Sequence, residues 1–373
     1  MKIAYLSTFY PYRGGISQFN ALLYRTFEKN NEIKAFTFTR QYPDILFPGQ
    51  IQYVTENDVV DKIEVARVLD TINPFSYLKT KNAIAGFDPD LLLMKFWMPF
   101  FAPSLGYVSG RLRKKGKTKS IAILDNVIPH EPKPGDMALI RYYLKRVDGF
   151  IAMSSVVEKD LLSLKPEAKY IVKAHPIYEH FGQNMDKAEA RKILNLPGNK
   201  NVLLFFGFIR DYKGVDVLLK AFSLLPENYH LVIAGEVYGS FDKYQDIINK
   251  LKLISKVSLF TRYIDNQEVP AFFSAADVCV LPYKSATQSG IVQIAYNFNL
   301  PVIATNMGGL SEMITDGETG LVIPACEPNL LADKIEEYFA KNHQIFSNNI
   351  LLRRPEYSWQ GFANAIIRLF EKM

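Results

Sequence analysis

The chain has 373 residues, of which 48% are hydrophobic, and its 44 Lys and Arg exceed its 38 Asp and Glu by 6. This length and apolar fraction exclude a disordered chain and favour two buried cores over one. No stretch has the ~18 consecutive apolar residues of a membrane span, and the first residues lack the pattern of a secretory signal, so we expect a cytoplasmic protein.

Short apolar segments alternate with helical segments through both halves of the chain. In the first half the predicted strands are KIAYLS, EIKAFTF, LLLMKF, SIAILD and GFIAMS. In the second half they are NVLLFFG, YHLVIAG, KVSLF, DVCVLPY and PVIAT. Continuous apolar strands separated by helices are typical of parallel sheets covered on both faces. The sequence therefore predicts an α/β protein with two doubly wound domains.

In such sheets, ligands bind beyond the carboxyl ends of the strands, where loops lead into helix N-termini. The first of these junctions has Gly14 and Gly15 before a helix expected to begin at Ile16 or Ser17. Two glycines let the backbone approach a ligand and leave N–H groups free at a positive helix end. The pair therefore predicts either an anion site or simply a tight turn.

The basic excess lies in the N-terminal half, where residues 1–180 hold about 25 Lys and Arg against about 18 Asp and Glu. Its densest part follows an aromatic-rich stretch, which favours either peripheral contact with an anionic membrane or a solvated helix end. The cations of this predicted contact are Arg111, Arg113, Lys114, Lys115, Lys117 and Lys119. No nucleic-acid motif is present, so nucleic acid is not an expected partner.

The strongest junction lies in the segment LLFFGFIRDYKGVDVLLKAF. A strand is expected to end at Gly207, and Arg210 and Lys213 occupy the loop before a helix that begins near Gly214. Two cations at the carboxyl end of a strand can neutralise a diphosphate, Arg as a fork and Lys as a point charge. We interpret them as a diphosphate site in preference to solvated surface charge.

Two further junctions follow in the C-terminal half. In SATQSGIVQ, Thr287 and Ser289 are hydroxyl residues of the N-cap type before a helix that starts near Gly290, and such hydroxyls also bind phosphate oxygens. The loop TNMGGLSEMITDGETGLVI then carries Glu312. The chain ends in a predicted helix with Phe362, Ile366 and Phe370 on one stripe, which needs a surface to pack against.

Four segments, taken in order, resemble the retaining glycosyltransferases of family 4, also called group 1: TFYPYRGGISQF, FFGFIRDYKGVDVLLKAF, ADVCVLPY and NLPVIATNMGGLSEMITDGETGLVI. The resemblance covers nearly the whole chain. It implies the GT-B fold, with two facing Rossmann-like domains and a C-terminal helix that crosses back to the N-terminal domain. The implied acceptor-side domain is 1–180 plus 356–373, and the implied nucleotide-sugar domain is 181–355.

The resemblance also implies an activity. It implies a hexosyltransferase that moves a sugar from a nucleotide diphosphate sugar to a glycan or glycolipid acceptor of cell-surface synthesis, with retention, at the inner face of the membrane. No cofactor is implied, and the Arg/Lys pair, without an Asp-x-Asp element, implies no metal. Two alternatives stay open: a non-catalytic partner subunit of the same fold, and a nucleotide-sugar 2-epimerase.

Site residues carried over from the family fall into two groups. The implied donor-binding residues are Gly14, Gly15, Arg210, Lys213, Thr287, Gln288, Ser289, Gly290, Ile291, Gln293 and Glu312. The implied catalytic residues are Arg210, Lys213, Asp125 and His130. Because the phosphate of the donor is expected to take the acceptor proton, stabilising the departing diphosphate is the main catalytic task.

The sequence departs from the family pattern at three places. Phe208 stands where the family has the first Arg of its loop, so Arg210 is expected to serve instead. Ala286 and Ile294 replace the paired glutamates of the family, so either Gln288 and Gln293 provide polar contacts in their place or donor binding is altered. At the family's His-Asp pair the chain has Asp125 and Asn126, and His130 is either a positioning residue or a structural loop residue.

Overall fold

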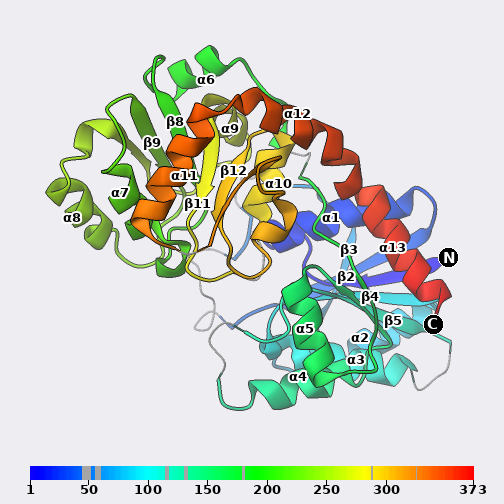
Figure 1. The fold of residues 1–373 in the computed structure, drawn as a ribbon. Coiled ribbons are helices and arrows are strands. Elements are labelled where there is room, and N and C mark those ends of the chain that lie inside the picture. The colour runs from blue at the N-terminus through cyan, green and yellow to red at the C-terminus, as the bar shows by residue number, and fades with distance from the viewer. Residues whose placement is uncertain are drawn as a thin grey trace. The chain divides into compact units, whose positions relative to one another are not determined.

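The computed structural model describes residues 1–43, 52–54, 60–113, 117–129, 133–178, 181–286, 289–324 and 326–373. These residues form two compact units (Figure 1). Unit 1 comprises Met1–His175 and Ser358–Met373, and unit 2 comprises Pro176–Tyr357. The boundaries predicted from the sequence, 180/181 and 355/356, lie a few residues from these divisions.

Unit 1 contains a seven-stranded parallel sheet in the order β3-β2-β1-β4-β5-β6-β7. Its strands are β1 (Lys2–Leu6), β2 (Glu32–Arg40), β3 (Val65–Asp70), β4 (Leu91–Phe96), β5 (Lys119–Leu124), β6 (Gly149–Ala152) and β7 (Lys169–Val172). The five strands predicted in this half are confirmed, whereas β3 and β7 were missed. Both are edge strands with partly exposed residues, so they lack the continuous apolar run of a central strand.

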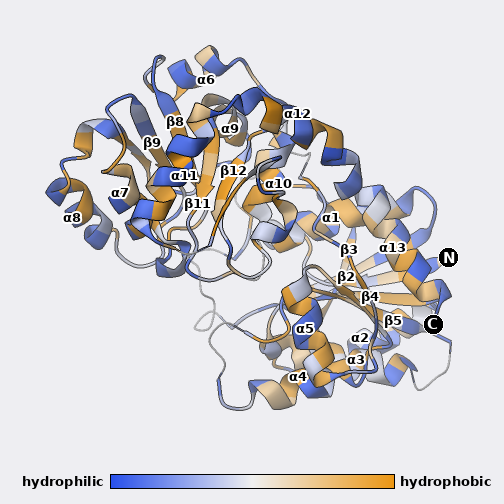
Figure 2. Cartoon of the chain, viewed as in Figure 1, coloured by the Kyte–Doolittle hydropathy of each residue, from blue (hydrophilic) through white to orange (hydrophobic). Residues whose placement is uncertain are grey.

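Helices cover both faces of this sheet. They are α1 (Gly15–Glu28), α2 (Pro74–Phe87), α3 (Ala102–Arg113), α4 (Asp136–Leu144), α5 (Ser155–Leu164) and α13 (Trp359–Glu371), with the 3-10 turn η2 (Pro99–Phe101). Alternate strand residues enter two separate cores, so that Leu6 packs with α2 to α5 and Tyr5 with α1 and α13. Figure 2 shows the strands as hydrophobic and the outer helix faces as largely hydrophilic.

The C-terminal helix α13 belongs to unit 1, as the family resemblance implied. Phe362 and Ile366 are fully buried in the core shared with α1. The Phe362 ring meets the Phe19 ring of α1 edge-on, with 5.5 Å between centroids. The apolar stripe of α13 thus covers one face of the N-terminal sheet.

Unit 2 contains a six-stranded parallel sheet in the order β10-β9-β8-β11-β12-β13. Its strands are β8 (Asn201–Phe206), β9 (Tyr229–Ala234), β10 (Val257–Phe260), β11 (Val278–Leu281), β12 (Val302–Thr305) and β13 (Gly320–Ile323). Its helices are α6 (Lys187–Ile193), α7 (Val215–Phe222), α8 (Asp242–Lys250), α9 (Val269–Ala275), α10 (Gly290–Asn297), α11 (Pro328–Ala340) and α12 (His343–Arg353). Short 3-10 turns among its described residues include η4 (Asp211–Lys213), η5 (Ile254–Lys256), η6 (Ser311–Met313) and η7 (Arg354–Tyr357).

The strand order of each sheet reverses beside its first strand. In unit 2 the reversal lies between β8 and β11, and in unit 1 between β1 and β4. Loops that leave two adjacent strands in opposite directions open a crevice at such a switch point, which is where doubly wound sheets bind ligands. Within the described part of the chain, no helix is long and apolar enough to cross a membrane.

Candidate functional site

The loop after β8 carries the two cations singled out in the sequence. Arg210 is the N-cap of η4 and Lys213 is its last residue. Gly214 follows with φ of 71°, in the left-handed region that favours glycine. A Cβ atom there would lie 1.9 Å from the Pro282 carbonyl oxygen. The loop therefore packs directly on the residue after β11, and Gly214 is a requirement that the sequence analysis did not identify.

Lys213 lies against an aromatic ring rather than a carboxylate. Its Nζ is 3.8 Å from the centroid of the Tyr283 ring and 5.4 Å from that of Tyr212. Burial and, to a smaller extent, the positive charge of Arg210 together lower the pKa of Lys213 to about 7. A cation–π contact recovers only part of the lost hydration, so a nearby anion would strongly favour the charged ammonium.

Arg210 is held in a similar way by a residue of another loop. Its guanidinium Cζ lies 4.1 Å from the centroid of the Tyr238 ring, in the loop after β9. Tyr238 also meets the Phe208 ring, at 4.9 Å between centroids. The Nε of Arg210 is buried and has no hydrogen-bond partner among the described residues. A buried unpaired donor is costly, and an oxygen of an anionic ligand would satisfy it.

The carboxylates of the same loop are engaged by other lysines. Asp211 forms ion pairs with Lys243 and Lys284, the second at 3.3 Å. Asp216 is 3.0 Å from Lys284. These acids are therefore neutralised without Arg210 or Lys213, whose charges stay available to a ligand.

The N-terminus of α10 adjoins the same site. Ser289 is its N-cap, and the Ser289 Oγ accepts a hydrogen bond from the Ile291 N–H at 3.3 Å. The Tyr283 hydroxyl is 3.2 Å from that Oγ, so one tyrosine contacts both Lys213 and the start of α10. The free N–H groups and dipole of this first turn favour an anion. The structure thus brings Arg210, Lys213, Ser289, Gly290 and Ile291 to one switch point.

The other predicted donor residues of unit 2 are placed differently. Thr287 and Gln288 lie outside the described residues. Gln293 is 2% exposed, and its Nε2 donates to the Met313 sulfur, so protein encloses its side chain. Glu312 is exposed in η6, beside Met313. Their donor contacts stay predictions.

In unit 1, the predicted glycines lie at the carboxyl end of β1. Gly14 is the N-cap of α1 with φ of 110°, and Gly15 begins the helix; both are exposed. A Cβ on Gly14 would meet no atom within 4 Å, so its backbone conformation, not crowding, favours glycine. Their predicted closure over the donor stays a prediction.

Asp125, a predicted catalytic residue, forms a buried ion pair that the sequence analysis missed. Its Oδ1 is 2.6 Å from the Nζ of Lys95, which is 2% exposed and lies 3.6 Å from the Phe19 ring centroid. Burial lowers the pKa of Lys95, and Asp125 opposes that shift. The sequence feature that could have revealed this ion pair is the single cation within the apolar strand LLLMKF. His130 lies outside the described residues.

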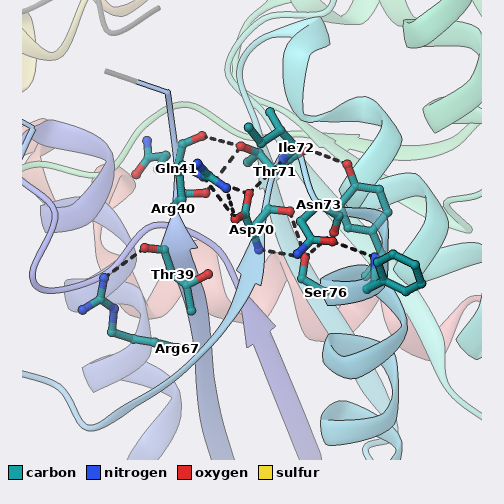
Figure 3. Close-up of polar contacts among 11 residues, drawn as sticks. Thr39, Arg40, Gln41, Arg67, Asp70, Thr71, Ile72, Asn73 and Ser76 are labelled. Carbon is teal, nitrogen blue, oxygen red and sulfur yellow. Dashed lines mark hydrogen bonds and ion pairs between the residues drawn. The ribbon is translucent and has the colours of Figure 1, made fainter. Parts of the chain in front are cut away.

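A second polar cluster, at the carboxyl ends of β2 and β3, is satisfied internally (Figure 3). Arg40 binds the Asp70 carboxylate through Nε and Nη2, and the Asp70 N–H donates to the Ser76 Oγ at 2.9 Å. The Asn73 side chain accepts from the Phe75 N–H and so caps α2. These contacts fix the start of α2 and identify the cluster as structural.

Residues 186–351 match the family model described as glycosyl transferases group 1. Residues 186–351 form a group 1 glycosyltransferase domain. Arg210, Lys213 and the start of α10 all lie within it.

Curated relatives of this glycosyltransferase domain include the D-inositol 3-phosphate glycosyltransferase of Mycolicibacterium gilvum, 28% identical over 49% of the chain and 42% of that protein. The chain spans about half the length of such relatives. An uncharacterized glycosyltransferase of Methanocaldococcus jannaschii is 24% identical over 100% of the chain and 99% of its own length.

Solved structures share the whole fold. Sucrose-phosphate synthase from Thermosynechococcus elongatus has a TM-score of 0.77 and 18% identity, over 100% of the chain and 99% of its own. Anabaena HepE, solved in complex with UDP, has a TM-score of 0.78 and 16% identity, over 100% of both chains. These matches show that the glycosyltransferase domain and unit 1 together make up the GT-B fold.

Proposed function

We propose that the chain is a glycosyltransferase that moves a sugar from a nucleotide diphosphate sugar to a glycan or glycolipid acceptor of cell-surface synthesis, with retention. The observation that carries the proposal is the pair Arg210 and Lys213. Both cations are partly buried against tyrosine rings, neither has a carboxylate partner among the described residues, and Tyr283 links Lys213 to the N-terminus of α10. Such a site is built to neutralise a diphosphate. The UDP bound to Anabaena HepE is a ligand of this class.

The proposed mechanism assigns distinct tasks to these groups. Arg210 Nε and its terminal nitrogens bind the diphosphate as a fork, and the Lys213 ammonium neutralises the charge that develops as the sugar–phosphate bond breaks. The Gly290 N–H binds another phosphate oxygen, because the Ile291 N–H already donates to the Ser289 Oγ. The departing phosphate takes the acceptor proton, so no side-chain base and no metal is required.

The proposal also places the acceptor on unit 1 and includes peripheral contact with an anionic membrane. Arg111 is exposed on the last turn of α3, and Lys117 is exposed and paired with Asp88. Arg113 is half-exposed beside Asp148, and Lys119 begins β5. An exposed ion pair is weak and exchanges readily for a lipid phosphate. The remaining two cations of the predicted contact, Lys114 and Lys115, lie outside the described residues.

Calorimetry with UDP, GDP and ADP tests the donor site. We expect at least one nucleotide to bind in the presence of EDTA, because two side-chain cations take the place of a metal ion. We also expect the nucleotide-sugar with the same base to support sugar transfer. A non-catalytic subunit would bind none of them. A 2-epimerase would convert the sugar nucleotide with no acceptor present, which product analysis by NMR would detect.

Nucleotide affinity is expected to fall as pH rises above 7. The free protein has a Lys213 pKa of about 7, and a bound diphosphate raises that pKa, so binding takes up a proton above pH 7. The dissociation constant should increase by up to about tenfold per pH unit until the pKa of the complex is reached. Titrations between pH 7.5 and 9.5 avoid the phosphate's own pKa of about 6.

The matched control for this pH dependence is Lys213→Arg, because a guanidinium stays protonated throughout the range. We expect its nucleotide affinity to be nearly constant with pH. An identical decline in both proteins would show that another group titrates.

A further inference from the structure

A pocket of about 590 Å³ lies between the ends of α3 and α4 in unit 1. It is separate from the residues of the proposed donor site, which belong to unit 2. Four cations and two tyrosines line it: Arg111, Arg113, Lys145, Arg146, Tyr107 and Tyr142. Among the described residues, no carboxylate lines the pocket.

The helix packing that forms this pocket depends on two glycines of α3. A Cβ on Gly106 would lie 2.7 Å from the Tyr142 ring, and one on Gly110 would lie 3.1 Å from Cδ of Arg146. Their i, i+4 spacing places both on the face of α3 that meets α4. Tyr142 and Arg146 can therefore lie flat against the α3 backbone, and Gly110 itself lines the pocket.

Contacts within the pocket wall fix Arg146. Its Cζ is 3.7 Å from the centroid of the Tyr142 ring, and its Nη1 donates to the Tyr142 carbonyl at 2.8 Å. The Arg146 carbonyl in turn accepts from the Ser109 hydroxyl at 2.7 Å. Across the pocket, Arg111 Cζ lies 5.3 Å from the Tyr107 ring centroid. A guanidinium stacked on a ring keeps its N–H edge available for a ligand.

The charge of the pocket is only partly balanced. Arg113 is 3.2 Å from Asp148, but Arg111, Lys145 and Arg146 have no carboxylate within ion-pair distance among the described residues. Arg113 also donates to the Lys145 carbonyl, at 3.2 Å, so it closes the end of α4. Three unpaired cations around one hollow repel each other unless an anion lies between them.

From this arrangement we infer that the pocket is a second anion site, which binds a phosphate-bearing ligand. Two arginine forks and an ammonium line one hollow and can bind several phosphate oxygens at once. A single carboxylate has too few oxygens to pair with all three cations. Tyr107 and Tyr142 supply apolar ring surface beside the phosphate. Such a phosphate is carried either by a soluble compound or by a lipid headgroup.

The test measures pyrophosphate binding by calorimetry in an R210Q/K213Q background, which removes the donor-site cations. The result is thus independent of whether the proposed donor site is correct. The pocket variant adds R111Q/K145Q, since both residues are exposed and make few internal contacts. The control adds K29Q/K79Q, which removes the same charge from exposed positions of unit 1 that do not line the pocket.

We expect R111Q/K145Q to weaken pyrophosphate binding at least tenfold and K29Q/K79Q to change it less than twofold. R146Q, tested separately with circular dichroism as a folding check, should weaken it similarly. Equal binding by the pocket variants and their parent, or equal loss in the control, overturns the inference, as does an absence of pyrophosphate binding by the parent.

Sedimentation with phosphatidylglycerol vesicles, against phosphatidylcholine vesicles, separates the two sources of the phosphate. If the ligand is a lipid headgroup, R111Q/K145Q reduces binding to phosphatidylglycerol vesicles at least tenfold and pyrophosphate competes with them. If the ligand is soluble, the variant loses pyrophosphate binding and keeps its vesicle binding. Either result supports the site, provided that the control K29Q/K79Q behaves as the parent does.

Discussion

Lys213→Ala is expected to weaken nucleotide diphosphate binding by roughly 10- to 150-fold, because a hydrogen bond to a charged group contributes ~1.5–3 kcal/mol. The loss in sugar transfer should be larger, since the charge on the departing diphosphate grows in the transition state. The same change should not lower the melting temperature of the free protein. Burial over Tyr283 lowers the pKa of Lys213, and no described residue gives it an anionic partner, so the cation adds little stability when the ligand is absent.

Lys220→Ala is the matched control for this experiment. Lys220 is exposed on α7, the helix that follows the cationic loop, and its removal changes the net charge equally. We expect nucleotide affinity within about twofold of the unmodified protein, as is usual for screened surface charges. Unchanged transfer kinetics in Lys213→Ala, measured with a nucleotide-sugar that the protein uses, would refute the assignment of the diphosphate site.

The second large effect concerns the buried ion pair of unit 1. Asp125→Ala leaves the ammonium of Lys95 buried without a counter-charge and should lower the free energy of unfolding of unit 1 by ~3–5 kcal/mol. Both tryptophans of the chain, Trp97 and Trp359, belong to unit 1. Urea unfolding followed by tryptophan fluorescence therefore reports on unit 1 separately from unit 2.

The double variant Lys95→Met/Asp125→Leu separates a structural role of this pair from a catalytic one. Replacing both charges with apolar side chains of similar size removes the unpaired charge, so most of the lost stability should return. Recovery of stability without recovery of sugar transfer would support the predicted catalytic role of Asp125. Recovery of both would make it structural, and an unaltered urea midpoint in Asp125→Ala would contradict the stability argument.

Much of the fold was predictable because its signals are local. The central strands are continuous apolar runs, and β8 and β11 were recognised from residues within each strand. The edge strands β3 and β7 were not predicted, because pairing with the neighbouring strand, rather than a continuous apolar run, makes them strands. Short β13 (GLVI) was missed because its brief apolar run was interpreted as part of the glycine-rich loop before it.

The sequence by itself determined which residues stand at the carboxyl ends of the strands, and so identified Arg210, Lys213 and the turn before α10 as candidates. Only the tertiary structure decided the state of those side chains. Tyr238 and Tyr283 reach the two cations from the loops after β9 and β11, and Lys95 meets Asp125 across 30 residues of chain. Burial and electrostatic pairing depend on neighbours in space, and a linear pattern specifies only neighbours along the chain.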